Sequence, residues 1–296
     1  MMEYLCIDVG GTRIKYAVIT DDYAILDYNV KPAKWQNSED FLACVEAIFY
    51  SYRMGLSGIA ISYCGELDPH SGVLLTGGMH TFNTGLDLKG ELEARCGVPV
   101  SVENDGNCAA LAEFNNGALK GVENGAVLVI GTGLSLAPIL GGKLYRGSHF
   151  FAGASSFAMT DVKGPLDWSN VQFALSGARF LPCTYEQCAG LEEGSLDGEA
   201  FFAKANAGDK TAISVLREYA HSLAAYIYNL QIILDLDVIA LGGGISAQPL
   251  LRETVGSALK QMMDGFPIPI YRPELRVCKY FNDANLLGAL YAHLNA

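Results

Sequence analysis

The sequence predicts an α/β protein of two lobes, each of which opens on a strand, a glycine turn and a second strand. Residues 4–9 form a β-rich apolar run that ends at a Gly-Gly-Thr turn (10–12), and residues 14–19 return with partial alternation. The order recurs where a Gly-Thr-Gly turn (131–133) follows the apolar run at 126–130. With 296 residues, the chain exceeds the roughly 250 at which a single core tends to split.

The other elements of the first lobe follow from apolar periodicity. Phe41, Val45 and Ile48 recur at helical spacing, for example, whereas short β-rich runs predict strands. After the opening hairpin we expect a third strand at 24–30, a helix at 41–54, a strand at 59–63, a helix at 87–96 and a strand at 98–102.

The second lobe is predicted in the same way, with a less regular region at 147–196. Its expected elements are strands at 134–140 and 143–145, a long helix at 210–236, a strand at 237–241, a helix at about 246–263 and a terminal helix at 283–293. We expect residues 1–117 to form the N-terminal lobe, with the C-terminal helix at 284–296 packing back on it. Residues 118–283 are then the C-terminal lobe.

Composition excludes several classes of protein. Half of the residues are hydrophobic and 18% are charged, which is typical of a folded globular protein. The net charge of −12 argues against a nucleic-acid partner, because such proteins usually carry basic patches. No apolar run approaches the ~18 residues of a membrane span. Glu3 and Asp8 stand where a secretion signal would be basic or apolar, so we expect a cytoplasmic protein without a membrane partner.

The eight cysteines lie mostly within apolar runs, as expected of small core residues in a reduced protein. Only Cys183 and Cys188 are close together, and no second pair of Cys or His residues lies near them. A zinc site with four ligands is therefore not expected.

The glycine turns admit two interpretations. Glycine lets the backbone N–H groups approach a phosphate closely, so that two turns can hold two phosphate groups. Each turn taken alone is more typical of an ordinary β-hairpin. The chain has neither the glycine-rich P-loop motif nor the glycine fingerprint of a dinucleotide fold.

The stretch VSVENDGNCAALAEF at 100–114 has a similar ambiguity. Glu103, Asn104 and Asp105 separate an apolar run from an Ala- and Leu-rich run. Asn and Asp are favoured helix N-caps, because their side-chain oxygens accept from free backbone N–H groups. From this stretch alone, the polar residues are either a helix start or a chemical site.

The order of the motifs resembles the ROK family of sugar kinases and sugar-responsive repressors, within the hexokinase and actin-like superfamily. The resemblance spans nearly the whole chain and rests on DVGGTRIKYAVI, VENDGNCAALAE, LVIGTG followed by GGKLYRGSHFFAG, and IALGGGIS. It implies a duplicated two-lobe actin-like ATPase (ribonuclease H-like) fold, with the active-site cleft between the lobes. It also implies an ATP-dependent kinase that phosphorylates a hydroxyl of a monosaccharide or sugar derivative.

The resemblance also implies roles for individual residues. The first phosphate region is Gly10, Gly11, Thr12 and Lys15, the second is Gly131, Thr132 and Gly133, and the residues beside the adenosine are Gly242, Gly243 and Gly244. The substrate-binding residues are Asn104, Asp105, Gly65 and Gln172, with Asp105 as the general base. Mg²⁺ would offset the phosphate charge of ATP.

This chain departs from the family pattern around the sugar. The family usually carries a Glu and, three residues later, a His that bind sugar hydroxyls, where this chain has Ala154 and Phe157; Gln172 stands where a further Glu is expected. The family's Cys-rich zinc loop is missing, and a lone His149 is more typical of a packed or surface residue than of a ligand. We therefore expect no structural zinc, with apolar anchors holding region 154–177 from among Phe150, Phe151, Phe157, Trp168 and Phe173.

The second turn also departs from the family pattern. Larger side chains, Leu134, Leu136 and Pro138, follow it where the family is glycine-rich. The alternative to a kinase is therefore a non-catalytic sugar-binding or regulatory member, and an actin-like or chaperone-like ATPase is a third possibility. The chain begins just before its first predicted strand, where the repressors carry a DNA-binding domain, so we expect no direct repression. We expect a homodimer, as is frequent in the family.

Overall fold

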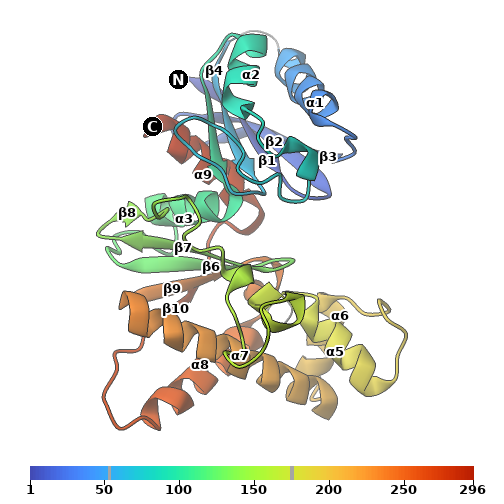
Figure 1. Ribbon diagram of the computed structural model, residues 1–296, viewed down its shortest axis with the longest axis vertical. Coiled ribbons are helices and arrows are strands. Elements are labelled where there is room, and N and C mark those ends of the chain that lie inside the picture. Colours follow the sequence, from blue (N-terminus) through green and yellow to red (C-terminus); the bar gives the residue numbers. More distant parts are fainter. Residues whose placement is uncertain (53–54, 174–176) are drawn as a thin grey trace. The chain divides into compact units, whose positions relative to one another are not determined.

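The computed structural model describes residues 1–52, 55–173 and 177–296 and divides the chain into two compact units (Figure 1). The first comprises Met1–Gly117, Arg146–Ala152 and Asn282–Ala296, and the second comprises Ala118–Tyr145 and Gly153–Phe281. The segment Arg146–Ala152, which the sequence reading placed in the second lobe, thus belongs to the first unit.

The first unit is built on a mixed sheet in the order β3-β2-β1-β4-β5. β1 pairs antiparallel with β2 and parallel with β4, β2 pairs antiparallel with β3, and β4 pairs parallel with β5. The strands are β1 (Glu3–Val9), β2 (Arg13–Thr20), β3 (Ile25–Pro32), β4 (Leu56–Tyr63) and β5 (Val100–Asn104). All five strands were predicted, but β5 ends at Asn104, two residues later than expected, because it continues its pairing with β4.

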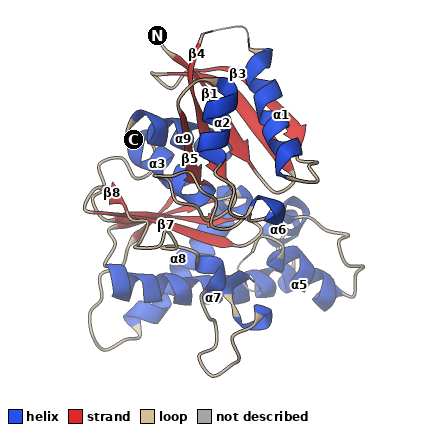
Figure 2. Ribbon diagram, turned by 45° about the horizontal axis from the view of Figure 1, so that its top comes forward, coloured by secondary structure: helices blue, strands red, loops and turns tan. Residues whose placement is uncertain are grey.

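Helices cover both faces of this sheet (Figure 2). The helices are α1 (Ser38–Ser51), α2 (Leu88–Cys96), α3 (Asp105–Asn116) and α9 (Ala284–Leu294). Leu5 and Ile7 form a core with residues of α1 and α2, and α9 packs on β1, β4 and α3. Gly288 permits this packing, since an added Cβ would collide with the Cys108 backbone of α3. The end predicted for the first helix, residues 53–54, lies outside the described residues.

The second unit repeats the strand topology in the order β10-β9-β6-β7-β8. Again the first strand pairs antiparallel with the second and parallel with the fourth, which confirms the predicted duplicated α/β fold. The strands are β6 (Gly125–Ile130), β7 (Leu134–Leu140), β8 (Lys143–Leu144), β9 (Val238–Gly242) and β10 (Glu274–Val277).

The second core lies between this sheet and the long helix α7, with Leu128 and Ile239 packing in the same cluster as Leu223 and Ile227. The helices are α5 (Phe180–Ala189), α6 (Gly198–Asn206), α7 (Lys210–Leu234) and α8 (Pro249–Asp264). Short 3-10 turns are η1 (Thr81–Asn83), η2 (Ser155–Phe157), η3 (Trp168–Asn170), η4 (Gly244–Ala247) and η5 (Phe281–Asp283).

The sequence did not predict α5, α6 or β10, and it left open whether residues 103–105 begin a helix, which the structure shows as α3. α5 lies in the region expected to be less regular, and α6 and β10 were not assigned. The helix expected from about 246 begins at Pro249, because the preceding residues form η4.

Candidate active site

Asp8 is a buried carboxylate near the end of β1, and the sheet register surrounds it with donors. Lys15 lies directly opposite it on β2, and Ser62 lies opposite it on β4. Ser62 Oγ donates to Asp8 Oδ1 at 3.1 Å, Asn285 Nδ2 of α9 donates to the same oxygen at 3.0 Å, and Lys15 Nζ lies 3.2 Å from Oδ2. These partners offset the cost of burying a charge.

The sequence reading used Asp8 only to exclude a secretion signal and missed it as a site residue. A carboxylate inside an otherwise apolar strand, two residues before a Gly-Gly turn, was the available signal. Carboxylate oxygens also suit Mg²⁺. Asp8 therefore fits a role in holding a metal ion beside the first glycine turn.

That turn is closed by backbone contacts. Gly10 N donates to Arg13 O at 3.0 Å, and the ring Nε2 of the buried His80 lies 3.0 Å from Gly10 O. A Cβ added to Gly11 would lie 2.7 Å from Cγ of Met79. A side chain at position 11 would therefore force the exposed Met79 side chain to move. Thr12 is exposed.

The junction between β5 and α3 separates the roles of Asn104 and Asp105. Asn104 is the N-cap: its Oδ1 accepts from Asn107 N at 3.2 Å, and its Nδ2 donates to Gly65 O at 3.1 Å. Asp105 is the first residue of α3, and its Oδ1 accepts from Gly106 N at 2.7 Å. Asn104 therefore caps the helix, which leaves the Asp105 carboxylate available for chemistry.

Asp105 is half-buried, and its surroundings change its acidity. The pKa of Asp105 is raised to about 6. Burial is the largest cause, the negative charge of Asp8 adds to the rise, and hydrogen bonds from backbone N–H groups oppose it. Asp105 is therefore a stronger base than an ordinary aspartate and is still mostly ionised at neutral pH.

Glu66 follows Gly65, which packs closely against Thr76 and Gly78. Burial, followed by the charges of Asp105 and Glu103, raises the pKa of the half-buried Glu66 to about 7. The sequence analysis predicted neither a role for Glu66 nor its raised pKa.

Glu103 binds Arg146, the first residue of the segment Arg146–Ala152 that belongs to the first unit. This carboxylate is 2% exposed, and its Oε2 accepts from Arg146 Nε at 2.9 Å and from Nη2 at 2.6 Å. Its Oε1 accepts from Asn107 Nδ2 at 2.9 Å and from Asn104 N at 3.0 Å. Glu103 thus connects Arg146 to the backbone beside Asp105.

In the second unit the structure brings the other two glycine segments together. Gly242 pairs with Val129 in the parallel β6–β9 ladder, immediately before the turn at 131–133. Gly243 has a φ of 91°, and an added Cβ would collide with the Ile130 backbone. Gly131 N donates to Gly133 O at 2.9 Å. Three exposed or half-buried residues, Gly131, Thr132 and Gly244, lie at this edge of the sheet.

The residues that depart from the family pattern surround η2. Ala154 precedes this turn, Phe157 ends it, and the buried Gln172 donates its backbone N–H to Ala158 O at 2.9 Å. The expectation of buried aromatic anchors was wrong. Trp168 contacts both Phe157 and Phe173. Phe157, Trp168 and Phe173 nevertheless remain 53%, 66% and 41% exposed, respectively.

The remaining two anchors are elsewhere in the fold. Phe150 and Phe151 belong to the first unit, where the Phe150 ring lies 6.0 Å from that of His70.

Among residues 1–52, 55–173 and 177–296, no three His, Cys, Asp or Glu side chains gather as a metal site would require. Cys183 and Cys188 lie on α5, where Arg179 Nη2 is 3.5 Å from Cys183 Sγ. The expectation of no structural zinc stays a prediction. Within the same described residues, no helix is long and apolar enough to cross a membrane.

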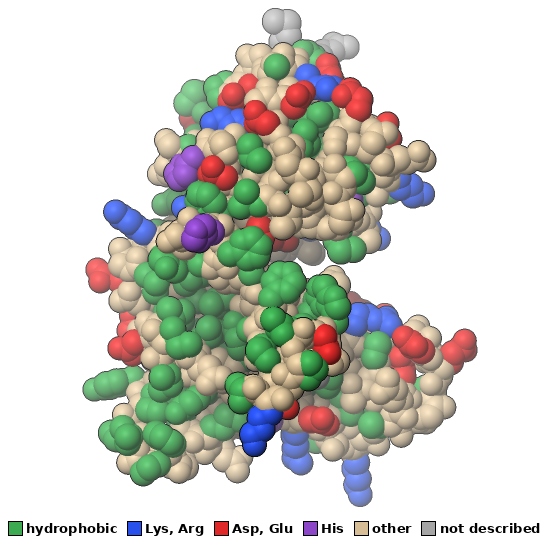
Figure 3. Space-filling model, in the orientation of Figure 1, with side chains coloured by type: hydrophobic (Ala, Val, Ile, Leu, Met, Phe, Trp, Pro, Cys, Tyr) green, Lys and Arg blue, Asp and Glu red, His purple; other side chains and the backbone are tan. Residues whose placement is uncertain are grey.

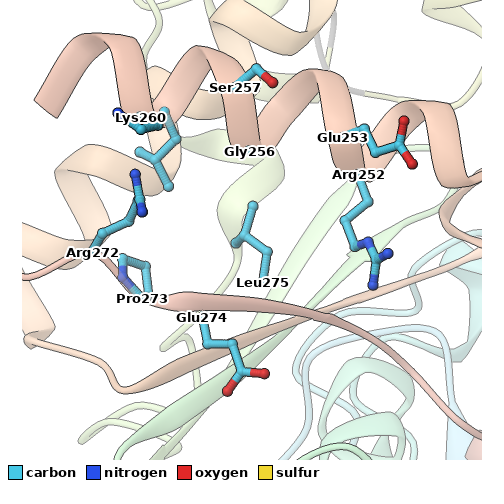
Figure 4. Close-up of a pocket in the computed structure, with 10 residues that line it drawn as sticks. Arg252, Glu253, Gly256, Ser257, Lys260, Arg272, Pro273, Glu274 and Leu275 are labelled. Carbon is cyan, nitrogen blue, oxygen red and sulfur yellow. The ribbon is translucent and has the colours of Figure 1, made fainter. Parts of the chain in front are cut away.

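A cavity of about 590 Å³ lies between α8 and β10, and basic and acidic side chains line it (Figure 4). Arg252, Lys260 and Arg272 contribute to it together with Glu274. Glu274 pairs with Val238, at the start of β9, whereas the glycine segment follows the end of that strand. Ligands of open α/β sheets bind at the carboxyl ends of the strands, so we assign this cavity no role.

Comparisons with known proteins agree with this geometry. A family model described as the ROK family matches residues 4–166 and 171–295. A β-glucoside kinase from Klebsiella pneumoniae is 33% identical over 99% of this chain and 96% of its own. A ROK family protein from Streptococcus pneumoniae, solved in complex with sucrose, has a TM-score of 0.89 and 31% identity, covering 99% of this chain and 98% of its own.

A ROK family glucokinase from Streptomyces griseus, solved in complex with glucose and AMPPNP, has a TM-score of 0.82. It is 25% identical, over 99% of this chain and 98% of its own.

Proposed function

The chain belongs to the ROK family and is a sugar kinase with the actin-like two-lobe fold, and from this premise we propose that it transfers the γ-phosphoryl group of ATP to a free hydroxyl of a β-glucoside. The observation that carries the proposal is Asp105, a half-buried carboxylate that is released from capping by Asn104 and has a raised pKa. The relatives named as kinases favour this function over a non-catalytic sensor.

Asp105 acts as the general base. The acceptor hydroxyl gives its proton to the Asp105 carboxylate while its oxygen bonds to the γ-phosphorus, and the bond from that phosphorus to the departing ADP oxygen breaks. A pKa of about 6 suits this role, since a base works best when its pKa lies near the operating pH. Gly106 N donates to Asp105 Oδ1 and thereby orients the carboxylate.

The nucleotide is held by the three glycine segments. The turns at 10–12 and 131–133 offer backbone N–H groups to the phosphates, with Lys15 as an additional cation, and Gly242–Gly244 lie beside the adenosine. When Mg²⁺ is bound with ATP it neutralises phosphate charge, and Asp8 is the residue that would hold it. The bound AMPPNP of the Streptomyces griseus glucokinase supports the use of ATP.

The acceptor lies against Asn104, Asp105, Gly65 and Gln172. Ala154 and Phe157 cannot hydrogen-bond to a sugar, so a part of the substrate near them must be less polar than a free monosaccharide. A β-glucoside meets this condition, because its anomeric oxygen carries a substituent. The β-glucoside kinase from Klebsiella pneumoniae supports the choice.

The test is ADP release measured with wild-type protein, Mg²⁺-ATP and a panel of glucose, N-acetylmannosamine and β-glucosides. We expect β-glucosides to be preferred and Asp105→Asn to lower kcat by roughly 10²–10⁴-fold, the usual contribution of a general base. The matched control is Asp87→Asn, which changes an exposed Asp at the start of α2. More than about a tenth of the wild-type kcat in Asp105→Asn would exclude Asp105 as the base.

We also propose that the protein is a homodimer without a nucleic-acid partner and is located in the cytoplasm. The family resemblance supports the homodimer. The net charge of −12 supports the absence of a nucleic-acid partner, and the reduced cysteines support a cytoplasmic location.

A further inference from the structure

A loop of the second unit presents three aromatic rings to solvent. Trp168 lies between Phe157 and Phe173, with ring centroids separated by 6.1 Å and 5.6 Å. Phe157 is 53% exposed, Trp168 66% and Phe173 41%, which are large fractions for side chains of this size. Figure 3 shows hydrophobic side chains gathered on this surface, over α7. Such patches on soluble proteins mark places where a ligand or a partner binds.

The backbone that carries Phe157 is firmly anchored. Ser156 Oγ donates to Leu134 O and accepts from Leu134 N, both at 2.9 Å. Tyr226 of α7 donates to Ser155 Oγ at 2.6 Å, and Leu136 N donates to Gly153 O at 2.9 Å. Phe157 is therefore exposed because of a fixed backbone and not because its segment lacks contacts.

The backbone that carries Trp168 is organised around Asn170, which is 6% exposed. Asn170 Nδ2 donates to Asp161 O at 2.7 Å and to Pro165 O at 2.9 Å. Its Oδ1 accepts from Thr160 Oγ1 at 2.9 Å and from Asp161 N at 2.7 Å. Binding to a wall preorganised in this way costs little ordering entropy.

The aromatic loop adjoins the second glycine turn. A Cβ added to Gly133 would lie 2.9 Å from Phe173 Cδ2 and would also collide with Ser156. The loop and the turn proposed to hold phosphate are thus in direct contact within one unit. Phe157, which lines the pocket, directly follows Ser156, and the Oγ of Ser156 bonds to the backbone of Leu134 immediately after the turn.

The geometry points to this pocket as the subsite for the anomeric substituent of the acceptor, which presents a flat apolar face to Trp168 and Phe157. The inference rests on the proposed function, which names a glycoside as the acceptor. The pocket has a volume of about 310 Å³ and is lined by Phe157, Leu166, Asp167, Trp168 and Val171. That volume is at the small end of ligand pockets, which begin at about 300 Å³, and suits one ring.

The pocket offers little to a charged partner. Among the lining residues that the structure describes, Asp167 is the only ionisable one. Its Oδ1 accepts from Ser169 N at 2.9 Å and from Ser169 Oγ at 2.6 Å as the cap of η3. An aryl ring and the C–H face of a second pyranose share the required chemistry, namely a flat apolar surface.

The experiment measures kcat and KM for phenyl β-glucoside, cellobiose and methyl β-glucoside with wild type, Trp168→Ala and Trp168→Phe. We expect Trp168→Ala to raise KM for phenyl β-glucoside about 10-fold, as for the loss of an aromatic contact, and KM for methyl β-glucoside less than about 2-fold. Trp168→Phe should restore most of the difference. A parallel effect on cellobiose assigns the subsite to pyranose as well as aryl rings, and no effect restricts it to aryl rings.

The matched control is Tyr271→Ala, which removes an aromatic residue of the same unit that is 87% exposed. It should leave every KM unchanged. Equal KM changes for phenyl and methyl β-glucoside in Trp168→Ala would overturn the inference. So would an unchanged KM together with a changed oligomeric state in light scattering, because the rings would then be an interface between copies of the chain.

Tryptophan fluorescence separates this inference from the proposed function. The chain has two tryptophans, and the other, Trp35, packs against Phe41 and His80. We expect cellobiose or phenyl β-glucoside to change wild-type fluorescence and to leave Trp168→Phe unchanged. If wild type phosphorylates no glucoside but shows this change, the proposed function fails and the subsite stands. If glucosides are phosphorylated without the change, the subsite fails alone.

Discussion

Two carboxylates, Asp8 and Asp105, have surroundings that suit different roles. Asp8 is buried among the Ser62, Asn285 and Lys15 donors, so its charge is balanced. Asp105 accepts from a backbone N–H group, and burial and the charge of Asp8 raise its pKa. When two carboxylates in one site have such different environments, one commonly stabilises charge and the other transfers a proton.

The raised pKa of Asp105 predicts the pH dependence of the kinase. A general base works when ionised, so activity is present above its pKa and is lost below it. With a pKa of about 6, kcat/KM should fall as pH drops through 6 and reach about a tenth of its plateau near pH 5. The measurement is kcat/KM for a β-glucoside from pH 5 to pH 8.

Glu66 is the control for this profile, because burial raises its pKa to about 7. Glu66→Gln should retain an acidic limb near pH 6. Loss of that limb in Glu66→Gln would assign the titration to Glu66 in place of Asp105.

At the scale of elements, the loop between β9 and α8 depends on one glycine. Gly243 has a φ of 91°, and a Cβ added to it would collide with the backbone of Ile130. A Cβ added to Gly244 would meet no atom within 4 Å. The two neighbours therefore differ in how much substitution they tolerate.

We expect Gly243→Ala to destabilise the protein by about 2 kcal/mol or more, through backbone strain and a collision with β6. It should also raise KM for ATP, because it displaces the proposed adenosine segment. Chemical denaturation and ADP-release kinetics measure the two effects. Gly244→Ala is the matched control with a small effect on stability, and equal stability losses in both variants would refute the steric explanation.

At the scale of the whole molecule, the two units share a topology but differ in chemistry. Asp8 is the residue before the last of β1, and the equivalent residue of β6 is Val129. The first unit contains the carboxylates Asp8, Asp105 and Glu103 together with the glycine turn at 10–12. The second unit contains the glycine segments at 131–133 and 242–244 and the aromatic loop. The strand before the glycine turn thus carries a carboxylate in the first unit and a valine in the second.

The intact protein should fold without zinc. Asn170 and the hydrogen bonds of η2 hold the loop that precedes α5, so no metal brace is needed there. We expect elemental analysis of purified protein to find no stoichiometric zinc, a chelator to leave Tm unchanged, and Mg²⁺ to be required only with ATP. One tightly held zinc per chain would refute this, and Cys183, Cys188 and His149 would be the first ligands to mutate.

Much of the fold was predictable from the sequence because its signals are local. All strands except β10, and the helices α1, α2, α7, α8 and α9, were predicted from apolar periodicity and glycine turns. The missed elements lack these signals: β10 has four residues, and α5 contains Pro182 and two cysteines. Phe157 and Trp168 were expected to be buried, since composition reports hydrophobicity and not accessibility.

The sequence by itself determined the duplicated strand–turn–strand order, the glycine segments and the Asn104–Asp105 pair, because each is a contiguous run whose backbone preferences act locally. Only the tertiary structure decided that Asp8 lies beside Asn285, 277 positions away, that Glu103 binds Arg146, and that Asn104 and not Asp105 is the cap. These contacts depend on strand register and helix packing, which bring together residues whose separation in the chain carries no signal of their proximity.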